Sequence, residues 1–317
     1  MDETVAGEGT MGGRDGRASD ERATDERAAD PRATAHQATG DGATGDDSES
    51  WEIARRLVRA RLGAFALPEY PGALPPSLDA GYATQDAAIA LWPSRIAGWK
   101  VGKIPDAWLA RMGEERLVGP IFEDAVQSAR PGEDATFAAI DGGFAAVEAE
   151  YVFRIGADAP PGKCLWSDEE ALALVDALLV GAELAGSPLP RINDLGPAVV
   201  VSDFGNNAGL ILGPAVPEWR RMLGAREQDL HCETSIDEVV VGYGRASDIA
   251  GGLVAALRFA LSRCARRGMP LRAGQFVSTG AATGIHDIRA GQRARVSFDG
   301  IAAIPVVAVP AMPRPQA

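Results

Sequence analysis

The stretch FAAVEAEYVF, residues 144–153, decides how the rest of this chain is interpreted. Its apolar residues are typical of a buried β-strand, yet Glu148 and Glu150 stand two positions apart within it. Because a strand alternates faces with a period of two, both carboxylates lie on one face. Neighbouring carboxylates repel each other, and each resists burial. The stretch therefore indicates either a solvated strand edge or a site where a positive charge neutralises the pair.

A third isolated acid favours the second interpretation. The apolar stretch LLVGAELAGSP, residues 178–188, contains Glu183 as its one charge. One divalent cation explains three acids in apolar strands more economically than three separate exposed edges do. Three carboxylate oxygens at about 2.0–2.1 Å would supply half of an octahedral Mg²⁺ shell and leave room for water or a chelating substrate. A 2-oxo acid chelates in this way, and the cation then acts as a Lewis acid that stabilises an enolate.

Composition and charge exclude several classes of partner. The chain has 317 residues, 46% of them hydrophobic, and a net charge of −13. An acidic protein without a basic stripe is not expected to bind nucleic acid or an anionic membrane surface. Three widely spaced cysteines, Cys164, Cys232 and Cys264, give neither a disulfide framework nor a zinc pattern. With no signal peptide and no apolar run long enough to span a bilayer, we expect a cytoplasmic protein.

The first fifty residues differ from the rest. They hold 13 acidic and five basic side chains, and from Ala18 to Asp47 they follow a degenerate five-residue repeat. Because the segment has almost no large apolar side chains, we expect residues 1–50 to be a disordered acidic tail. A docking or solubilising arm, or a start codon assigned too far upstream, would give the same composition.

Residues 51–317 are expected to form a single catalytic domain with a small helical part at its N-terminal end. Apolar periodicity predicts helices over residues 51–62, 78–92, 105–112, 168–181 and 248–268, the fourth of them with a capping box from Ser167 to Glu170. Residues 98–104, 274–280, 292–300 and 301–309 are predicted strands, the last two joined by a hairpin turn. Since helices and strands do not alternate regularly, we expect an α+β fold with a curled, largely antiparallel sheet.

Common catalytic motifs are absent from the sequence. It has no nucleophile elbow and no phosphate loop, and GYGRAS, residues 242–247, lacks the third glycine of a dinucleotide fingerprint. Its three histidines are His36, His231 and His286, so a metal site built on two histidines is nearly excluded. A metal would be held by oxygen atoms, which favours a hard cation such as Mg²⁺ or Mn²⁺.

Six segments resemble one family in their order along the chain. They are GWKVGK, GPIFED, VEAEYVF, GAELAGS, NDLGPAVVVSDFGNNAGLILG and STGAATG. The sequence is similar over residues 51–310 to the 2-keto-4-pentenoate hydratases of the fumarylacetoacetate hydrolase superfamily, which also contains the oxalocrotonate decarboxylases. The resemblance implies a mixed β-sandwich roll flanked by helices. It also implies Mg²⁺ or Mn²⁺ at Glu148, Glu150 and Glu183.

The same resemblance implies catalytic residues and a reaction. Lys100 in GWKVG would face the substrate, and Asp124 in FED would position the attacking water. The implied enzyme adds water to 2-hydroxypenta-2,4-dienoate and forms 4-hydroxy-2-oxopentanoate in the breakdown of aromatic compounds. It would be a homo-oligomer that can associate with a decarboxylase paralogue. A cationic Lys100 would stabilise negative charge that develops on the substrate.

The sequence departs from the family in the segment SDFGNNAG. Asp203 is retained, but Phe204 stands where the family has asparagine, and Asn206 lies near the position of the family's serine. We expect Asp203 and Asn206 to bind substrate, together with two residues of the loop STGAATG, Thr279 and Gly280. His286 is expected to bond a backbone carbonyl, with an acid–base role as the alternative, and His231 is expected to be exposed.

Three functions remain open at this point. Hydration is the first. The second is cleavage of a C–C bond at the same site, by a decarboxylase of the oxalocrotonate type or a hydrolase of an acylpyruvate. The third is a non-catalytic partner subunit, which the retention of three acids and Lys100 disfavours.

Overall fold

The computed structural model describes residues 45–314. Most of the expected acidic tail therefore lies outside the described residues. Its last part does not, because helix α1 runs over Gly45–Leu62 and so begins before the expected boundary at residue 50. The Glu49 carboxylate accepts a hydrogen bond from the Ala73 amide at 3.3 Å, which joins the start of α1 to the following loop.

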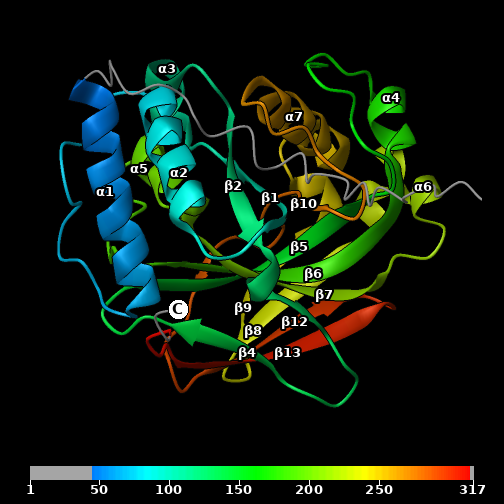
Figure 1. Ribbon diagram of the computed structural model, residues 1–317. Coiled ribbons are helices and arrows are strands. Elements are labelled where there is room, and N and C mark those ends of the chain that lie inside the picture. Colours follow the sequence, from blue (N-terminus) through cyan, green and yellow to red (C-terminus); the bar gives the residue numbers. More distant parts are fainter. Residues whose placement is uncertain (1–44, 315–317) are drawn as a thin grey trace, which may run out of the picture. The chain divides into compact units, whose positions relative to one another are not determined.

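The helices lie on one side of a large sheet, and a smaller sheet lies on its other side (Figure 1). Ile53, Leu57 and Val58 of α1 are buried, as the apolar periodicity predicts. The helices and short 3₁₀ turns are α1 (Gly45–Leu62), α2 (Leu78–Leu91), α3 (Asp106–Met112), η1 (Glu123–Ala125), α4 (Asp168–Ala173), α5 (Pro197–Ser202), η2 (Phe204–Asn206), α6 (Trp219–Met222), η3 (Gly224–Asp229), η4 (Ala246–Asp248) and α7 (Gly252–Arg266).

Two sheets form the rest of the fold. The eight-stranded sheet has the order β2-β1-β10-β5-β6-β7-β3, with β11 paired to β5, and the five-stranded sheet has the order β4-β13-β12-β8-β9. The strands are β1 (Ile96–Lys103), β2 (Arg116–Phe122), β3 (Val126–Ser128), β4 (Ala135–Ala139), β5 (Phe144–Ile155), β6 (Val175–Ser187), β7 (Asn207–Ala215), β8 (His231–Ile236), β9 (Val239–Arg245), β10 (Phe276–Ser278), β11 (His286–Asp287), β12 (Arg293–Phe298) and β13 (Ala302–Pro310). Most pairs are antiparallel and three are parallel, so the expected α+β class is confirmed.

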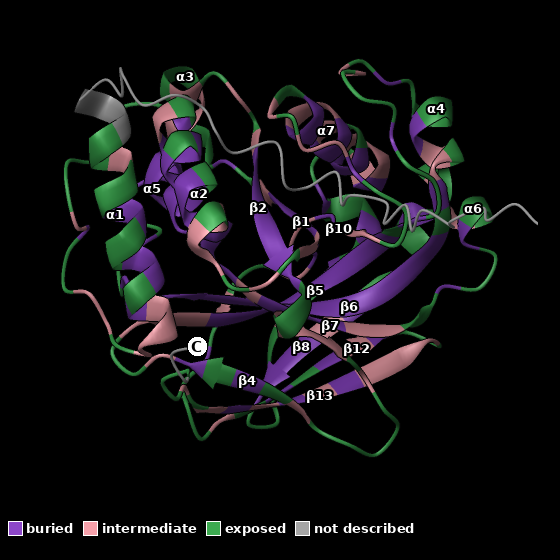
Figure 2. Cartoon of the chain, in the orientation of Figure 1, coloured by how far each residue is buried: buried purple, intermediate pink, exposed green. Residues whose placement is uncertain are grey.

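The core lies between and above the sheets, where β5 and β6 are buried over nearly their whole length (Figure 2). Tyr151 of β5 and Phe298 of β12 meet edge to face with their ring centroids 5.4 Å apart, and this contact joins the two sheets. Cys232 and Cys264 are buried free thiols, and Cys164 is a half-buried one, as expected from their spacing. Within residues 45–314, no helix has the length and apolarity needed to cross a membrane.

One predicted helix is wrong over half its length. The capping box from Ser167 to Glu170 is present, but α4 ends after one and a half turns and residues from Val175 onward form β6. Because β6 is covered on both faces, its sequence is an almost continuous apolar run rather than an alternating one. Periodicity does not separate such a strand from a buried helix. This strand carries Glu183, one of the three expected metal ligands.

Candidate metal centre

The register of β5 against β6 brings three acids together. Glu148 of β5 lies directly opposite Glu183 of β6, and Glu150 follows two positions further along β5. Residues that face each other in an antiparallel pair point to the same side of the sheet. Carboxylate oxygens of all three lie within 4.8 Å of one another, and the residues are at most 3% exposed. The two separate extended segments of the sequence therefore converge on one point.

The cluster has the free oxygen atoms that a cation needs. Glu148 Oε1, Glu150 Oε1 and Glu183 Oε2 are buried, and none has a hydrogen-bond partner among the residues that the structure describes. Buried polar atoms of native proteins nearly always have a partner, so one unsatisfied oxygen on each of three adjacent acids is unusual. Three converging carboxylates are also the ligand type that Mg²⁺ and Mn²⁺ prefer. The residues present thus fit a hard divalent cation.

Burial makes the charged cluster costly in the absence of a cation. Loss of solvent raises the pKa of Glu148 to about 7, although Lys100 opposes this and Glu183 adds to it. Burial raises the pKa of Glu150 well above its ordinary value, and repulsion from Glu183 and Glu148 raises it further. These carboxyl groups consequently hold protons at pH values where exposed glutamates are fully ionised.

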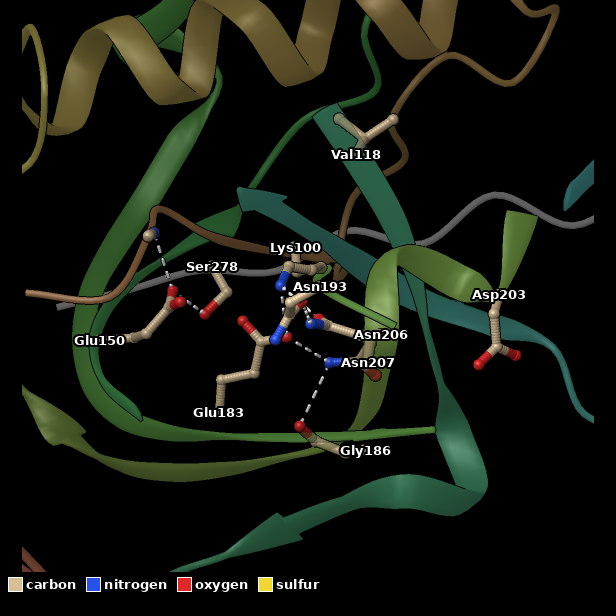
Figure 3. Close-up of polar contacts among 12 residues, drawn as sticks. Lys100, Val118, Glu150, Glu183, Gly186, Asn193, Asp203, Asn206, Asn207 and Ser278 are labelled. Atoms are coloured by element: carbon tan, nitrogen blue, oxygen red, sulfur yellow. Dashed lines mark hydrogen bonds and ion pairs between the residues drawn. The ribbon is translucent and has the colours of Figure 1, made fainter. Parts of the chain in front are cut away.

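Lys100 supplies a positive charge next to the acids. It lies on β1, is 5% exposed, and places its Nζ 3.2 Å from Glu183 Oε1. The same ammonium group donates a hydrogen bond of 3.0 Å to Asn206 Oδ1 (Figure 3). Burial by itself would lower the pKa of Lys100, but the three carboxylates outweigh it and raise the pKa above its ordinary value. Lys100 is therefore a cation at neutral pH.

Donors from the loop after β10 fix Glu150. Its Oε2 accepts hydrogen bonds from the Ser278 hydroxyl and, at 2.9 Å, from the Gly280 amide. The hydroxyl of Thr279, the residue between them, donates to the Tyr151 carbonyl at 2.7 Å. Thr279 and Gly280, expected to bind substrate, thus have their donors engaged in holding β5. They still form part of the wall of the adjoining cavity.

That cavity gives the cluster access to a small molecule. Its volume is about 550 Å³, in the range of ligand pockets in general. Lys100 and Glu148 open into it, beside Asn206 and Asn193. The wall is mostly apolar, with Leu117, Val200 and Ile249 among its members. The hollow therefore combines a mostly apolar lining with polar groups near the carboxylates and with four further charged side chains, Lys103, Arg116, Asp248 and Asp287.

A tight left-handed turn places two asparagines at the site. Phe204, Gly205 and Asn206 all have positive φ, at 57°, 64° and 57°. This conformation is rare for residues other than glycine and is held here by close packing. A Cβ atom on Gly119 of β2 would lie 2.0 Å from the Phe204 carbonyl oxygen, so only glycine fits beneath the turn. Beyond the turn, Asn207 donates a hydrogen bond of 3.0 Å to Glu183 Oε1.

The same turn sends Asp203 the other way, which corrects our expectation that it binds substrate. Its carboxylate is set apart from the cluster and points away from it (Figure 3). It forms a buried ion pair with Arg61 of α1 at 2.5 Å and accepts a hydrogen bond from Ser187 at 2.5 Å. Asp203 does not line the cavity formed by the described residues. It anchors α1 to the sheet.

Asp124 is not in the site either, so the expectation that it positions water there is also wrong. It lies in η1, where it forms an ion pair with Arg314 and its amide donates to the Ser94 hydroxyl at 3.3 Å. Lys100 is paired with Gly119 on β2. Phe122, the last residue of β2, lies three residues beyond Gly119, which is about 10 Å along the strand at a rise of about 3.3 Å per residue. Asp124 follows beyond that end.

Neither histidine in the described part of the chain lines the cavity. His286 is half-buried and its Nε2 lies 3.0 Å from the Thr283 carbonyl oxygen, as expected, and burial lowers its pKa. His231 is exposed, also as expected. Sequence reasoning missed Ser278 and Asn207, which hold two of the acids. The adjacent asparagines of GNNAG, in an apolar stretch, were a signal for Asn207, whereas an isolated serine before Thr279 gave none.

Comparison with known proteins identifies the fold. No protein-family model and no curated protein matches the sequence. The 4-oxalocrotonate decarboxylase of Pseudomonas putida G7, solved with calcium and acetate, is similar with a TM-score of 0.68 at 18% identity, over 85% of this chain and 100% of its own. Its complex with magnesium and adipate gives the same values. The chain has the fumarylacetoacetate hydrolase-like fold. At this identity the likeness concerns the fold, and the reaction is argued from the site.

We expect replacement of Asp203 by asparagine to weaken folding without changing substrate affinity. Asp203→Asn leaves the buried Arg61 guanidinium without its counter-charge, which should lower the free energy of unfolding by about 3–5 kcal/mol. Urea denaturation measures this loss. Asp194→Asn, which breaks an exposed pair with Arg191, is the control and should cost less than about 1 kcal/mol. A raised KM at unchanged stability would restore a substrate-binding role to Asp203.

The metal-free protein should lose stability as the pH rises toward 7. Glu148 has a folded-state pKa of about 7 against an ordinary value of 4.5, so the folded state binds more protons than the unfolded state in this interval. Stability is then fully present below about pH 4.5 and is lost as the pH rises through about 7. Thermal unfolding in chelator between pH 5 and 8 measures it. Glu148→Gln should flatten the curve, whereas the exposed Glu169→Gln should not. A Tm that rises over this range in the unaltered protein contradicts the prediction.

Proposed function

We propose that this chain is a lyase that uses Mg²⁺ or Mn²⁺ to act on a short 2-oxo acid. The observation that supports this most directly is the buried cluster of Glu148, Glu150 and Glu183, each with an unsatisfied oxygen, beside the wall of a cavity. In this proposal the three carboxylates hold the cation. When bound, it would supply a Lewis acid for the 2-oxo group of the substrate.

Lys100 has the position and charge to assist at the same group. Its ammonium group is buried, opens into the cavity and is held by Glu183 and Asn206. A fixed cation in a water-poor site stabilises negative charge that develops on a substrate oxygen or carbon. Its protons can also be transferred to that charge. In this proposal Asn206 orients Lys100, while Asn207 and Ser278 orient Glu183 and Glu150.

The first reaction that we propose is hydration of 2-hydroxypenta-2,4-dienoate to 4-hydroxy-2-oxopentanoate, as in aromatic catabolism. The dienol takes up one water molecule and is converted to the 2-oxo form, so negative charge develops near its 2-oxygen during proton transfer. In this proposal the cation held by the carboxylate cluster and the ammonium group of Lys100 would stabilise that charge. In this proposal the reacting water molecule would be bound in the cavity. Besides Glu148, the acids that line the cavity are Asp248 and Asp287, and both are exposed.

Decarboxylation of a 2-oxo diacid is the second candidate, and the position of Asp124 favours it. Hydration requires a residue that positions water, and the acid expected in that role lies outside the site. Loss of CO₂ from 2-oxohex-3-enedioate requires no water: the electron pair of the breaking C–C bond moves toward the 2-oxo group and a proton follows. The same cluster and the same lysine would serve this reaction. A hydrolase of an acylpyruvate would again need activated water.

Metal binding and turnover should respond separately to two substitutions. In the unaltered protein, Mg²⁺ or Mn²⁺ should raise the Tm, because a ligand that binds only the folded state stabilises it by mass action. Glu183→Gln should abolish that rise. Lys100→Met should retain it while turnover falls by about 10²–10³-fold, since a preorganised charge is lost. Lys163→Met is the control and should change neither, because Lys163 pairs with Glu170 and does not line the cavity. An unaltered protein whose Tm does not respond to either cation contradicts the proposal.

Product analysis decides between the two reactions. The metal-loaded enzyme is supplied separately with 2-hydroxypenta-2,4-dienoate and with 2-oxohex-3-enedioate. We expect 4-hydroxy-2-oxopentanoate from the first and, if decarboxylation is the reaction, CO₂ from the second. Chelator should abolish turnover and added Mg²⁺ should restore it. Turnover of neither compound, with metal bound, would leave the non-catalytic subunit as the better description of this chain.

A further inference from the structure

Strand β9 exposes an unusual amount of apolar surface for an edge strand. Val239, Val240, Val241 and Tyr243 are 64%, 39%, 42% and 74% exposed. In the described part of the chain β9 pairs with β8 alone and ends the five-stranded sheet. Its outer edge therefore presents unpaired backbone N–H and C=O groups beside exposed valines. Edges of this kind pair readily with another strand.

The usual devices that protect such an edge are mostly missing from β9. Proteins commonly block edges with proline, charged side chains or bulges. The residues between Glu238 and Arg245 include neither a proline nor a charge. The pairing with β8 has one irregularity, near Val241. β9 thus retains the composition of a strand that has a partner on both sides.

The charges at the two ends of β9 indicate what that partner is. The turn Asp237–Glu238 precedes the strand, and Arg245 ends it. Glu238 and Arg245 are both exposed, and neither forms an ion pair within residues 45–314. If a second copy of β9 lies antiparallel to the first, the acidic turn of each copy lies beside Arg245 of the other. A strand with opposite charges at its ends is in this way complementary to itself.

We propose that β9 is the contact between two copies of this chain, which pair antiparallel across a two-fold axis. The two five-stranded sheets would then join into one continuous sheet of ten strands. Main-chain hydrogen bonds along the edge and burial of the exposed valines and Tyr243 would stabilise the contact. None of the three clustered acids lies on β9, so the proposed contact does not depend on the reaction that the site performs.

Charged substitutions on β9 test the contact. The mass in solution, measured by light scattering at micromolar concentration, should be an even multiple of the monomer mass. The double substitution Val241→Lys with Tyr243→Lys brings like charges together across the axis and should halve that mass. Leu165→Lys, at a site that is 81% exposed elsewhere on the surface, is the control and should leave it unchanged. A monomeric unaltered protein, or an assembly whose mass the double substitution leaves intact, would overturn the proposal.

Single cysteines provide a second test that does not depend on how the lysine variant folds. In a Cys164→Ser background, one cysteine at a time is placed at Val239, Val240, Val241 and Tyr243. Facing residues of an antiparallel pair have Cα atoms about 4.5–5.5 Å apart, which suits a disulfide. The position on the two-fold axis should therefore form a disulfide-linked dimer under mild oxidation, and Leu165→Cys should not. Absence of a cross-link at all four positions would overturn the proposal.

Discussion

The site depends on like charges being buried side by side. The antiparallel register of β5 and β6 places Glu148 opposite Glu183, and the two-residue period of the strand adds Glu150. In the interior each carboxylate loses its hydration and is repelled by the other two, a cost that Lys100 compensates only in part. The three carboxylates can remain ionised together when a divalent cation, which carries more charge than Lys100, binds to them. Hydrogen bonds from Ser278 and Gly280 fix Glu150, and one from Asn207 fixes Glu183, while one oxygen of each acid stays without a partner among the described residues.

Backbone conformation determines which polar residues face the cavity and which face the helices. The left-handed turn at Phe204, Gly205 and Asn206 rests on Gly119, where a side chain would collide with the Phe204 carbonyl. It directs Asp203 toward Arg61 and the helical layer, and Asn206 toward Lys100 and the cavity. Residues three apart in the sequence consequently have unrelated tasks. Asp203 holds α1 in place, and Asn206 accepts a hydrogen bond from Lys100.

The two sheets also divide their tasks. The eight-stranded sheet carries the carboxylates and Lys100. Helices cover the face of this sheet that lies opposite the five-stranded sheet (Figure 2). The five-stranded sheet supports it from below through contacts such as Tyr151 with Phe298, and it ends in the uncovered edge β9. The proposed metal centre and the proposed contact between two copies therefore lie in different sheets of the fold.

The sequence by itself determined the α+β class, the shared face of Glu148 and Glu150, and the isolation of Glu183 in an apolar run. These follow from local rules, because strand periodicity and the cost of burying a charge do not depend on distant residues. Only the tertiary structure decided which polar residues reach the acids. Asp124 and Asp203 have suitable chemistry, yet the end of β2 and the turn after Asp203 carry them elsewhere, while Ser278 and Asn207 reach the cluster from β10 and β7. The extent of β6 was likewise settled by its neighbours on both faces, since a strand buried on both sides loses the alternation by which a sequence reveals it.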